Sequence, residues 1–271
     1  MSHFEKQDNN WFKTIVFNVL KSVPHIVSND VRDFFSQIMF KLSSEKIALE
    51  GVCEVDQNGI PVPTLSENLS DKISPEIAKK PLVMFVGGAF DGSYSYPSIY
   101  KTVSGGLFPK YYSENNEVQD VCYSTWKSSV SLDIIRAWSE AGQKICLIGH
   151  SWGGDTALEI AEKLSEEGVE IDLLCTIDPV SFDVIYGGIQ KPTGVKNWIN
   201  ISVDYNHDSL SNFANIPAIT GGFWGDHTMA DMSFIASSAE IDGEHVIFDH
   251  SMAEAMFYHY LNNTVQHFHE I

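Results

Sequence analysis

A serine flanked by glycines is the clearest chemical signal in this chain. Gly149-His150-Ser151-Trp152-Gly153 follows the apolar stretch Ile145–Ile148 and precedes Thr156–Leu164, whose apolar residues have helical spacing. A serine on such a strand-to-helix turn has a strained backbone, and glycines two residues on either side let strand and helix close up. The turn exposes the hydroxyl above the sheet, and the helix N-terminus favours a developing oxyanion. The sequence therefore predicts that Ser151 is a nucleophile in acyl transfer.

A nucleophilic serine needs a histidine to accept its proton and a carboxylate to orient that histidine. Two carboxylates end expected strands after Ser151: Asp178, which precedes Pro179, and Asp204, which precedes Tyr205. Ten histidines compete for the role of base. His150 lies inside the turn, where its side chain points away from the hydroxyl, and is expected to be structural. The other candidates after Ser151 are His207, His227, His245 and His250; His259, His267 and His269 fall on or after the last expected helix and are expected at the surface.

Strands and helices alternate around Ser151. Apolar runs predict strands at about 81–86, 118–124, 144–148, 173–177 and 198–203. Helical spacing predicts helices at about 129–142, 156–164 and 252–265, and the rest of the C-terminal third is expected to be loop. Alternation of this kind implies a parallel sheet with right-handed crossovers. We therefore expect an α/β fold with a mostly parallel central sheet and helices on both faces.

The first 80 residues have a different pattern from the rest. Two amphipathic helices are predicted between Trp11 and Leu42, separated by Pro24, and a hairpin with Asn58-Gly59 at its turn is predicted to follow. The sequence therefore predicts a helical N-terminal extension with a short hairpin over 1–80, packed on a catalytic core over 81–271. The two parts are expected to form one structural unit.

The Gly-His-Ser-Trp-Gly turn, with its strand and helix, resembles the nucleophile elbow of the α/β-hydrolase superfamily, and in particular its lipase-like branch, over about residues 80–265. A strand that ends in Asp-Pro after the nucleophile helix is similar to the acid site of neutral lipases, so the resemblance implies Asp178 as the acid. Asp204, one strand later, is the alternative.

The same resemblance places the base on a loop just before the final helix. Asp242-Gly243-Glu244-His245 has that position, so His245 is implied as the base, with His227 and His250 as alternatives. It also implies an oxyanion hole made by two backbone amides. One belongs to Trp152, after the nucleophile, and the other to Ala89 in the glycine-rich loop after an earlier strand.

Composition excludes several other classes of function. The formal net charge is −19, with 36 acidic and 17 basic side chains, which argues against nucleic acid as a partner. The four cysteines, at 53, 122, 146 and 175, form no Cys-x-x-Cys pair, so neither a zinc site nor a disulfide framework is indicated. No metal and no cofactor is expected. The sequence contains no secretory signal and no stretch long enough to span a bilayer, which predicts a protein made in the cytoplasm and leaves signal-independent export open.

These features predict a Ser-His-Asp ester hydrolase that works through an acyl-enzyme. Aromatic residues near the expected site, among them Phe223 and Trp224, and the amphipathic N-terminus favour a lipase- or phospholipase-like enzyme acting on an ester or lipid, with a transient contact at a membrane interface. The alternatives are a carboxylesterase, thioesterase or amidase for small substrates, and a catalytically silent hydrolase fold used for binding. A signal-less bacterial phospholipase effector is a further hypothesis. The natural substrate, acyl-chain length and protein partner stay open.

Overall fold

The structure is a computed structural model of the 271-residue chain. It describes residues 51–52, 80–88, 91, 101–125, 130–181, 188–205, 212–215, 218–219, 222–226 and 229–270. The chain divides into two compact units, Met1–Ala48 and Leu49–Ile271, and every described residue belongs to the second. The predicted N-terminal helices and the turn of the predicted hairpin lie outside the described residues.

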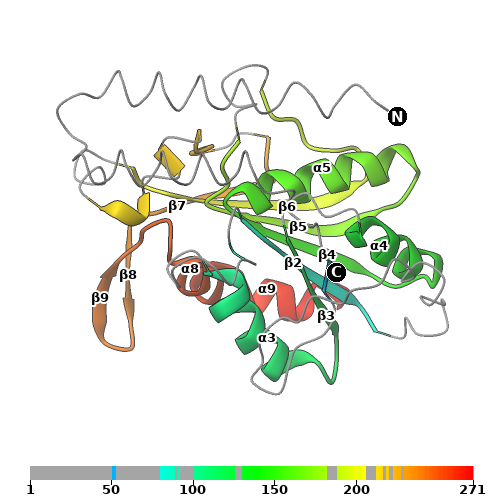
Figure 1. The fold of residues 1–271 in the computed structure, drawn as a ribbon, viewed down its shortest axis with the longest axis horizontal. Helices are drawn as coiled ribbons and strands as arrows, with labels where there is room; N and C mark the ends of the chain where they lie inside the picture. The colour runs from blue at the N-terminus through cyan, green and yellow to red at the C-terminus, as the bar shows by residue number, and fades with distance from the viewer. Residues whose placement is uncertain are drawn as a thin grey trace, which may run out of the picture. The chain divides into compact units, whose positions relative to one another are not determined.

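A mostly parallel sheet is the centre of the described part of the chain. Its seven strands have the order β1-β3-β2-β4-β5-β6-β7 (Figure 1). Their bounds are β1 Gly51–Val52, β2 Leu82–Gly87, β3 Asp120–Thr125, β4 Ile145–His150, β5 Ile171–Ile177, β6 Val195–Val203 and β7 Met232–Ala236. All neighbouring strands pair in parallel except β1, which runs antiparallel to β3. The parallel sheet predicted from the alternation of strands and helices is confirmed.

The central strands are buried on both faces, which explains the apolar runs in their sequences. Every residue of β2, β4 and β5 is buried. One face packs against α4 (Val130–Glu140) and α5 (Trp152–Glu166). The other face packs against α3 (Phe108–Asn115), α8 (Ala253–Tyr260) and α9 (Asn262–His267), as Figure 1 shows. The prediction of helices on both faces is therefore confirmed.

The structure differs from the expected elements mainly near the C-terminus. The predicted loop region contains the edge strand β7 and a separate antiparallel hairpin, β8 (Ser238–Ile241) and β9 (Glu244–Ile247). The predicted final helix is two helices, α8 and α9, which meet at Leu261. Shorter helical turns are η2 (Val103–Leu107), which leads into α3, η4 (Phe213–Asn215) and η5 (Phe268–Glu270).

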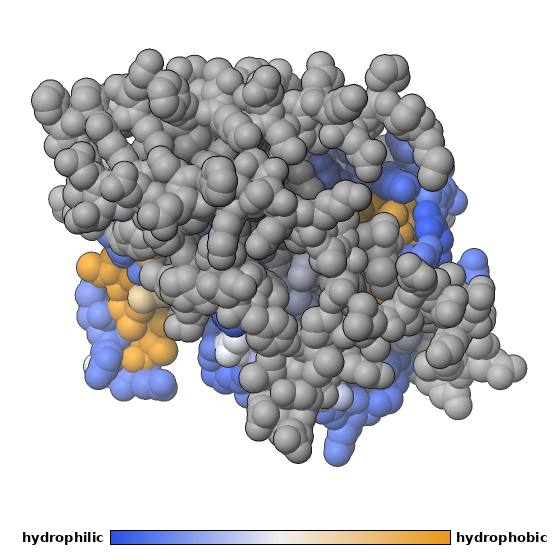
Figure 2. Space-filling model, viewed as in Figure 1, coloured by the Kyte–Doolittle hydropathy of each residue, from blue (hydrophilic) through white to orange (hydrophobic). Residues whose placement is uncertain are grey.

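Apolar side chains are exposed on β7 and β9. Met232 and Ile235 of β7 and Ile247 of β9 are among the exposed large apolar residues. Figure 2 shows apolar residues gathered at the left of the view, where the β8–β9 hairpin lies in Figure 1. No helix within the described residues is both long and apolar enough to cross a membrane.

Candidate active site

Ser151 lies on a tight turn between β4 and α5, as the sequence predicts. Its backbone has φ 57° and ψ −133°, a conformation that costs free energy for a residue with a side chain. The flanking glycines explain how the turn closes. A Cβ atom on Gly149 would lie 2.2 Å from the carbonyl oxygen of Gly153, and one on Gly153 would lie 2.2 Å from the carbonyl oxygen of Val86. Only residues without side chains fit at these two places.

Asp178 directly follows β5 and is fully buried. Its carboxylate accepts a hydrogen bond from the backbone N–H of Val203 at 2.9 Å, and a second from the hydroxyl of Tyr205. Burial alone would raise the pKa of Asp178, but the hydrogen bonds from His250, Tyr205 and Val203 and the charge of His250 lower the pKa below its usual value. Asp178 is therefore an ionised acceptor in the centre of the site.

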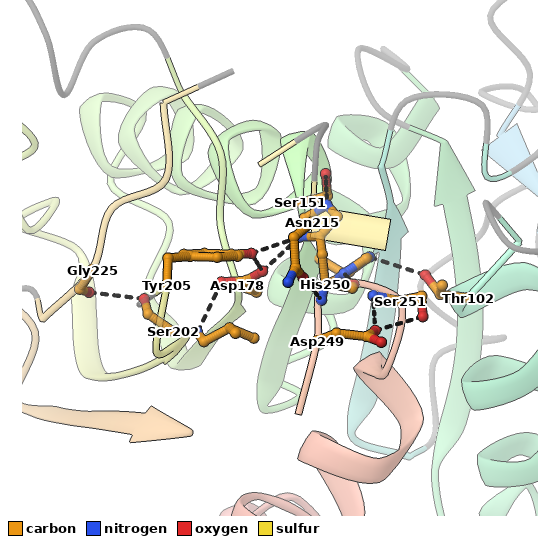
Figure 3. Close-up of polar contacts among 12 residues, drawn as sticks. Thr102, Ser151, Asp178, Ser202, Tyr205, Asn215, Gly225, Asp249, His250 and Ser251 are labelled. Atoms are coloured by element: carbon orange, nitrogen blue, oxygen red, sulfur yellow. Dashed lines mark hydrogen bonds and ion pairs between the residues drawn. The ribbon is translucent and has the colours of Figure 1, made fainter. Parts of the chain in front are cut away.

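His250 connects Ser151 to Asp178 (Figure 3). Its Nε2 lies 2.9 Å from Oγ of Ser151, and its Nδ1 lies 2.5 Å from Oδ2 of Asp178. Since a carboxylate only accepts, Nδ1 carries the proton and Nε2 is left to accept from the serine hydroxyl. The hydroxyl of Tyr205 lies 3.4 Å from the same Nδ1.

His245 does not reach this site, so the prediction that it lies beside Ser151 is wrong. It lies on the exposed hairpin strand β9, where its Nδ1 is 3.2 Å from the exposed Glu240. The cause is the sequence Asp242-Gly243, in which both residues have positive φ, 53° and 81°. Such an Asp-Gly pair is typical of a two-residue hairpin turn. The loop that returns to the site comes after the hairpin and ends at His250, one of the two alternatives.

The other predicted site residues lie elsewhere. Asp204 is exposed one residue after β6, and its backbone N–H bonds the carbonyl oxygen of Ala236 rather than an active-site group. His227, His207 and Ala89 lie outside the described residues. The structure therefore brings together Ser151, Asp178 and His250, and leaves Asp204 and His245 at the surface.

The loop that carries His250 is fixed by side chains that the sequence analysis did not single out. Oδ1 of Asn215 accepts the backbone N–H of His250 at 2.9 Å. Oδ1 of Asp249 accepts the backbone N–H and the hydroxyl of Ser251 at 2.8 and 2.6 Å. An Asp two residues before a Ser is a turn signal of this type, and it could have drawn attention to His250.

The backbone that faces Ser151 comes from two elements. Trp152 begins α5 directly after the serine, at the positive end of the helix dipole. Gly88, just after β2, lies so close that a Cβ atom there would be 2.8 Å from Cβ and 3.2 Å from Oγ of Ser151. The residue before Ala89 therefore lies against Ser151.

Asp91, three residues after Gly88, forms hydrogen bonds to η2 and to β3. It is buried, and its carboxylate accepts hydrogen bonds from the backbone N–H groups of Val103 and Ser104, at 2.9 and 2.8 Å, and from the hydroxyl of Tyr123 at 2.7 Å. Burial outweighs these bonds and raises the pKa of Asp91 to about 6. The residues that the structure describes contain no group of three or more His, Cys, Asp or Glu placed to hold a metal ion.

The arrangement identifies the architecture. Ser151 between β4 and α5, Asp178 after β5 and His250 before the last helices follow the order Ser, Asp, His along a mostly parallel sheet. The fold is that of the α/β-hydrolases.

No protein-family model and no curated protein matches the chain. Among solved structures, it is similar to a bacterial heroin esterase, with 12% identity and a TM-score of 0.39, over 94% of this chain and 97% of that one. It is also similar to YbtT, a type II thioesterase of yersiniabactin biosynthesis, with 12% identity and a TM-score of 0.36, over 70% and 92% of the two chains. An esterase of Pyrobaculum calidifontis matches with 15% identity and a TM-score of 0.36, over 82% and 87%. At this level of similarity, the chemistry of the chain has to be inferred from its own side chains.

Proposed function

We propose that this protein is a serine hydrolase that cleaves a carboxylic ester through an acyl-enzyme. The observation that carries the proposal is the continuous hydrogen-bond path from Oγ of Ser151 through the imidazole of His250 to the carboxylate of Asp178, with steps of 2.9 and 2.5 Å. Nucleophile, base and orienting carboxylate are all within hydrogen-bond reach, which is the geometric requirement for activating a serine.

In the first half of the reaction, Nε2 of His250 takes the hydroxyl proton of Ser151 while Oγ attacks the ester carbonyl. The tetrahedral intermediate then collapses, the C–O bond to the alcohol breaks, and the imidazolium returns the proton to the leaving alcohol. In the second half, His250 takes a proton from water, which attacks the acyl-Ser151. The acid product leaves, and the proton returns to the serine. No cofactor takes part.

Asp178 assists both halves of the reaction because its carboxylate stabilises the imidazolium of His250. Its carboxylate is ionised, because the hydrogen bonds it accepts keep its pKa low despite burial. Nδ1–H of His250 donates to it and so keeps Nε2 available for the proton of the serine.

For the oxyanion we propose the backbone amides of Trp152 and Ala89. Trp152 has the position that directly follows the nucleophile at a helix N-terminus, which favours negative charge. Support for Ala89 comes from its neighbour Gly88, whose backbone lies against Ser151.

For the substrate we propose a lipid or a medium-chain ester rather than a small polar ester. Phe223 supports this choice: the residue is 37% exposed, and its ring lies 4.7 Å from that of Tyr205, whose hydroxyl contacts Asp178. This arrangement places an apolar surface beside the site. A carboxylesterase, thioesterase or amidase for small substrates is the second candidate. A chain-length series of p-nitrophenyl esters, with and without lipid vesicles, separates them: a small-substrate enzyme prefers the shortest esters and gains nothing from vesicles.

The base and the nucleophile are tested together with three variants. We expect Ser151→Ala and His250→Gln to lower ester turnover by roughly 10⁴-fold or more, because each removes a member of a unit that acts together. His245→Gln, the matched substitution on the exposed hairpin, is expected to leave turnover unchanged. Loss of activity in His245→Gln with retention in His250→Gln would contradict the assignment of the base.

A fluorophosphonate probe gives an independent measurement of the nucleophile. We expect the probe to label the wild type and to fail on Ser151→Ala, with circular dichroism showing that the variant is folded. Absence of labelling in the wild type would instead support a catalytically silent fold used for binding.

A further inference from the structure

His150 occupies a place that connects the nucleophile turn to the base. It is the last residue of β4, one position before Ser151, and only 4% of it is exposed. Its Nε2 lies 2.8 Å from the backbone carbonyl oxygen of His250, and its Nδ1 lies 3.0 Å from the hydroxyl of Thr102. The rings of His150 and His250 are 4.9 Å apart between centroids.

These two contacts fix the tautomer of His150. A carbonyl oxygen can only accept a hydrogen bond, so Nε2 of His150 must carry a proton and donate. In the neutral ring Nδ1 then has a lone pair, which accepts the hydroxyl proton of Thr102. By donating to Nδ1, Thr102, which lies just before η2, favours the tautomer of His150 that bonds His250.

The surroundings also keep this imidazole uncharged. Burial, followed by the nearby His250, lowers the pKa of His150 to about 3, although the charge of Asp178 acts in the opposite direction. A second imidazolium beside His250 would oppose the charge that His250 acquires when it takes the proton of the serine. A neutral ring supplies a hydrogen bond without that cost.

We propose that His150 is a positioning residue for His250: its neutral Nε2–H donates to the backbone carbonyl of His250 and so keeps the imidazole of the base within reach of Ser151. The inference rests on the proposed function, because it concerns the same base. It adds that the residue before the nucleophile fixes the base through its backbone.

The need for such a bond follows from where the base comes from. Ser151 lies on a strand-to-helix turn, whereas His250 lies on a loop between a hairpin and α8, 99 residues later in sequence. The backbone N–H of His250 is held by Asn215, which belongs to η4 and not to the nucleophile turn. Among the described residues, the hydrogen bond from His150 joins the backbone of His250 to β4. A misplacement of about 1 Å at a reacting group can cost about a hundredfold in rate.

Two amide substitutions of His150 distinguish the role of its Nε2 from that of its Nδ1. Nε2 of glutamine is as many bonds from Cβ as Nε2 of histidine, whereas the amide nitrogen of asparagine corresponds to Nδ1. His150→Gln is therefore expected to donate to the carbonyl of His250 and to keep kcat within about threefold of the wild type, while His150→Asn loses this donor and lowers kcat by about ten- to a hundredfold. KM is expected to stay within about twofold in both, because the proposed bond does not touch the substrate.

Thr102→Val tests the tautomer. It removes the donor to Nδ1 of His150 and permits the ring form whose Nε2 has no proton, so we expect a decrease in kcat smaller than that of His150→Asn. His267→Gln, the same substitution at an exposed histidine of α9, is the control and is expected to leave kcat unchanged.

Proton NMR gives a measurement that does not depend on turnover. The Nδ1 proton shared between His250 and Asp178 is expected to give a far-downfield resonance that is retained in His150→Gln and lost or broadened in His150→Asn. If this pattern occurs in a protein that neither hydrolyses esters nor reacts with the probe, the proposed function fails and the positioning role stands. If the wild type is active, then equal kcat in His150→Gln and His150→Asn, or losses in both that only follow loss of folded protein, overturns the positioning role alone.

Discussion

Tyr205 lies beside Asp178 and His250, and its contribution to the stability of the protein can be measured. Its hydroxyl donates to Asp178, a carboxylate without exposed surface, and lies 3.4 Å from Nδ1 of His250. A hydrogen bond to a buried charge contributes more than one between neutral groups. We expect Tyr205→Phe to lower the free energy of unfolding at pH 7 by about 1.5–3 kcal/mol.

This effect should depend on pH in a defined direction. Because hydrogen bonds lower the pKa of Asp178 in the folded protein, its contribution to stability is present above its unfolded pKa of about 3.8 and is lost as the pH falls through the folded value. The difference between wild type and Tyr205→Phe should therefore shrink below about pH 4. Urea unfolding at several pH values measures it. Tyr258→Phe, which removes a hydrogen bond to the exposed Glu114, is the control. We expect it to change the free energy of unfolding by less than about 1 kcal/mol.

Asp91 should show the opposite dependence on pH. Burial raises its folded pKa to about 6, above the unfolded value of 3.8, so its favourable contribution is complete below pH 3.8 and is lost as the pH rises through 6. Asparagine has a similar shape and does not ionise. We expect the stability of the wild type relative to Asp91→Asn to fall by about 2.5 kcal/mol between pH 4 and pH 8.

Urea unfolding of both proteins across this pH range tests the prediction. All other titrating groups are shared, so their contributions cancel in the difference between the two curves. Parallel curves would show that the carboxylate of Asp91 does not titrate in this range in the folded protein.

At the scale of elements, the nucleophile turn depends on how closely β4 approaches α5. A Cβ atom on Gly149 would lie 2.2 Å from a backbone oxygen of α5, and the neighbouring atoms belong to backbone rather than to flexible side chains. We expect Gly149→Ala to lower the free energy of unfolding by about 3 kcal/mol or more, because strand and helix must separate.

Gly105→Ala is the matched control for this substitution. A Cβ atom there would meet only Cβ of Lys101, at 3.2 Å, on the exposed side of η2. We expect a change within about 1 kcal/mol, because alanine is favourable in a helix. Urea unfolding compares the two, and equal losses in both would contradict the packing explanation of the turn.

The central elements could be predicted from sequence because their burial leaves a strong pattern. The strands β2, β4 and β5 are buried on both faces, so each contains a run of apolar residues: Leu82–Val86, Ile145–Ile148 and Leu173–Cys175. The place of Ser151 followed from the glycines that its turn requires. Asp178 could be singled out because it directly follows a strand of this kind.

The peripheral elements left weaker signals. The edge strand β7 has only one buried residue, Ala236, so it lacks both the continuous apolar run of a central strand and a clear alternation. The sequence predicts a loop at Asp242-Gly243, where the structure has a hairpin turn, so it places His245 at the position beside Ser151 that His250 occupies. Asn215 and Tyr205 could not be predicted, because their contacts depend on how distant segments meet.

At the scale of the whole molecule, the site is assembled at the carboxyl ends of the strands. The strands β4, β5 and β6 run in parallel, so the residues that follow them lie at the same edge of the sheet. These residues are Ser151, Asp178 and Tyr205. The last turn before α8 then brings His250 to that edge. The sheet therefore fixes three of the four groups, and the proposed bond from His150 connects the fourth to it.

The overall charge leads to a prediction for the whole molecule. A formal net charge of −19 on 271 residues produces self-repulsion that is stronger in the compact folded state than in the unfolded chain. Raising NaCl from about 0.1 to about 1 M shortens the screening length from ~10 to ~3 Å. We expect the free energy of unfolding at pH 7.5 to rise with salt, on the order of 1 kcal/mol, when urea is the denaturant because urea adds no ions. The same titration near the sequence pI of about 4.7 is the control, since the net charge is then close to zero and the dependence on salt should largely vanish. An equal dependence at both pH values would instead indicate that salt acts through apolar burial, which it strengthens whatever the charge of the protein.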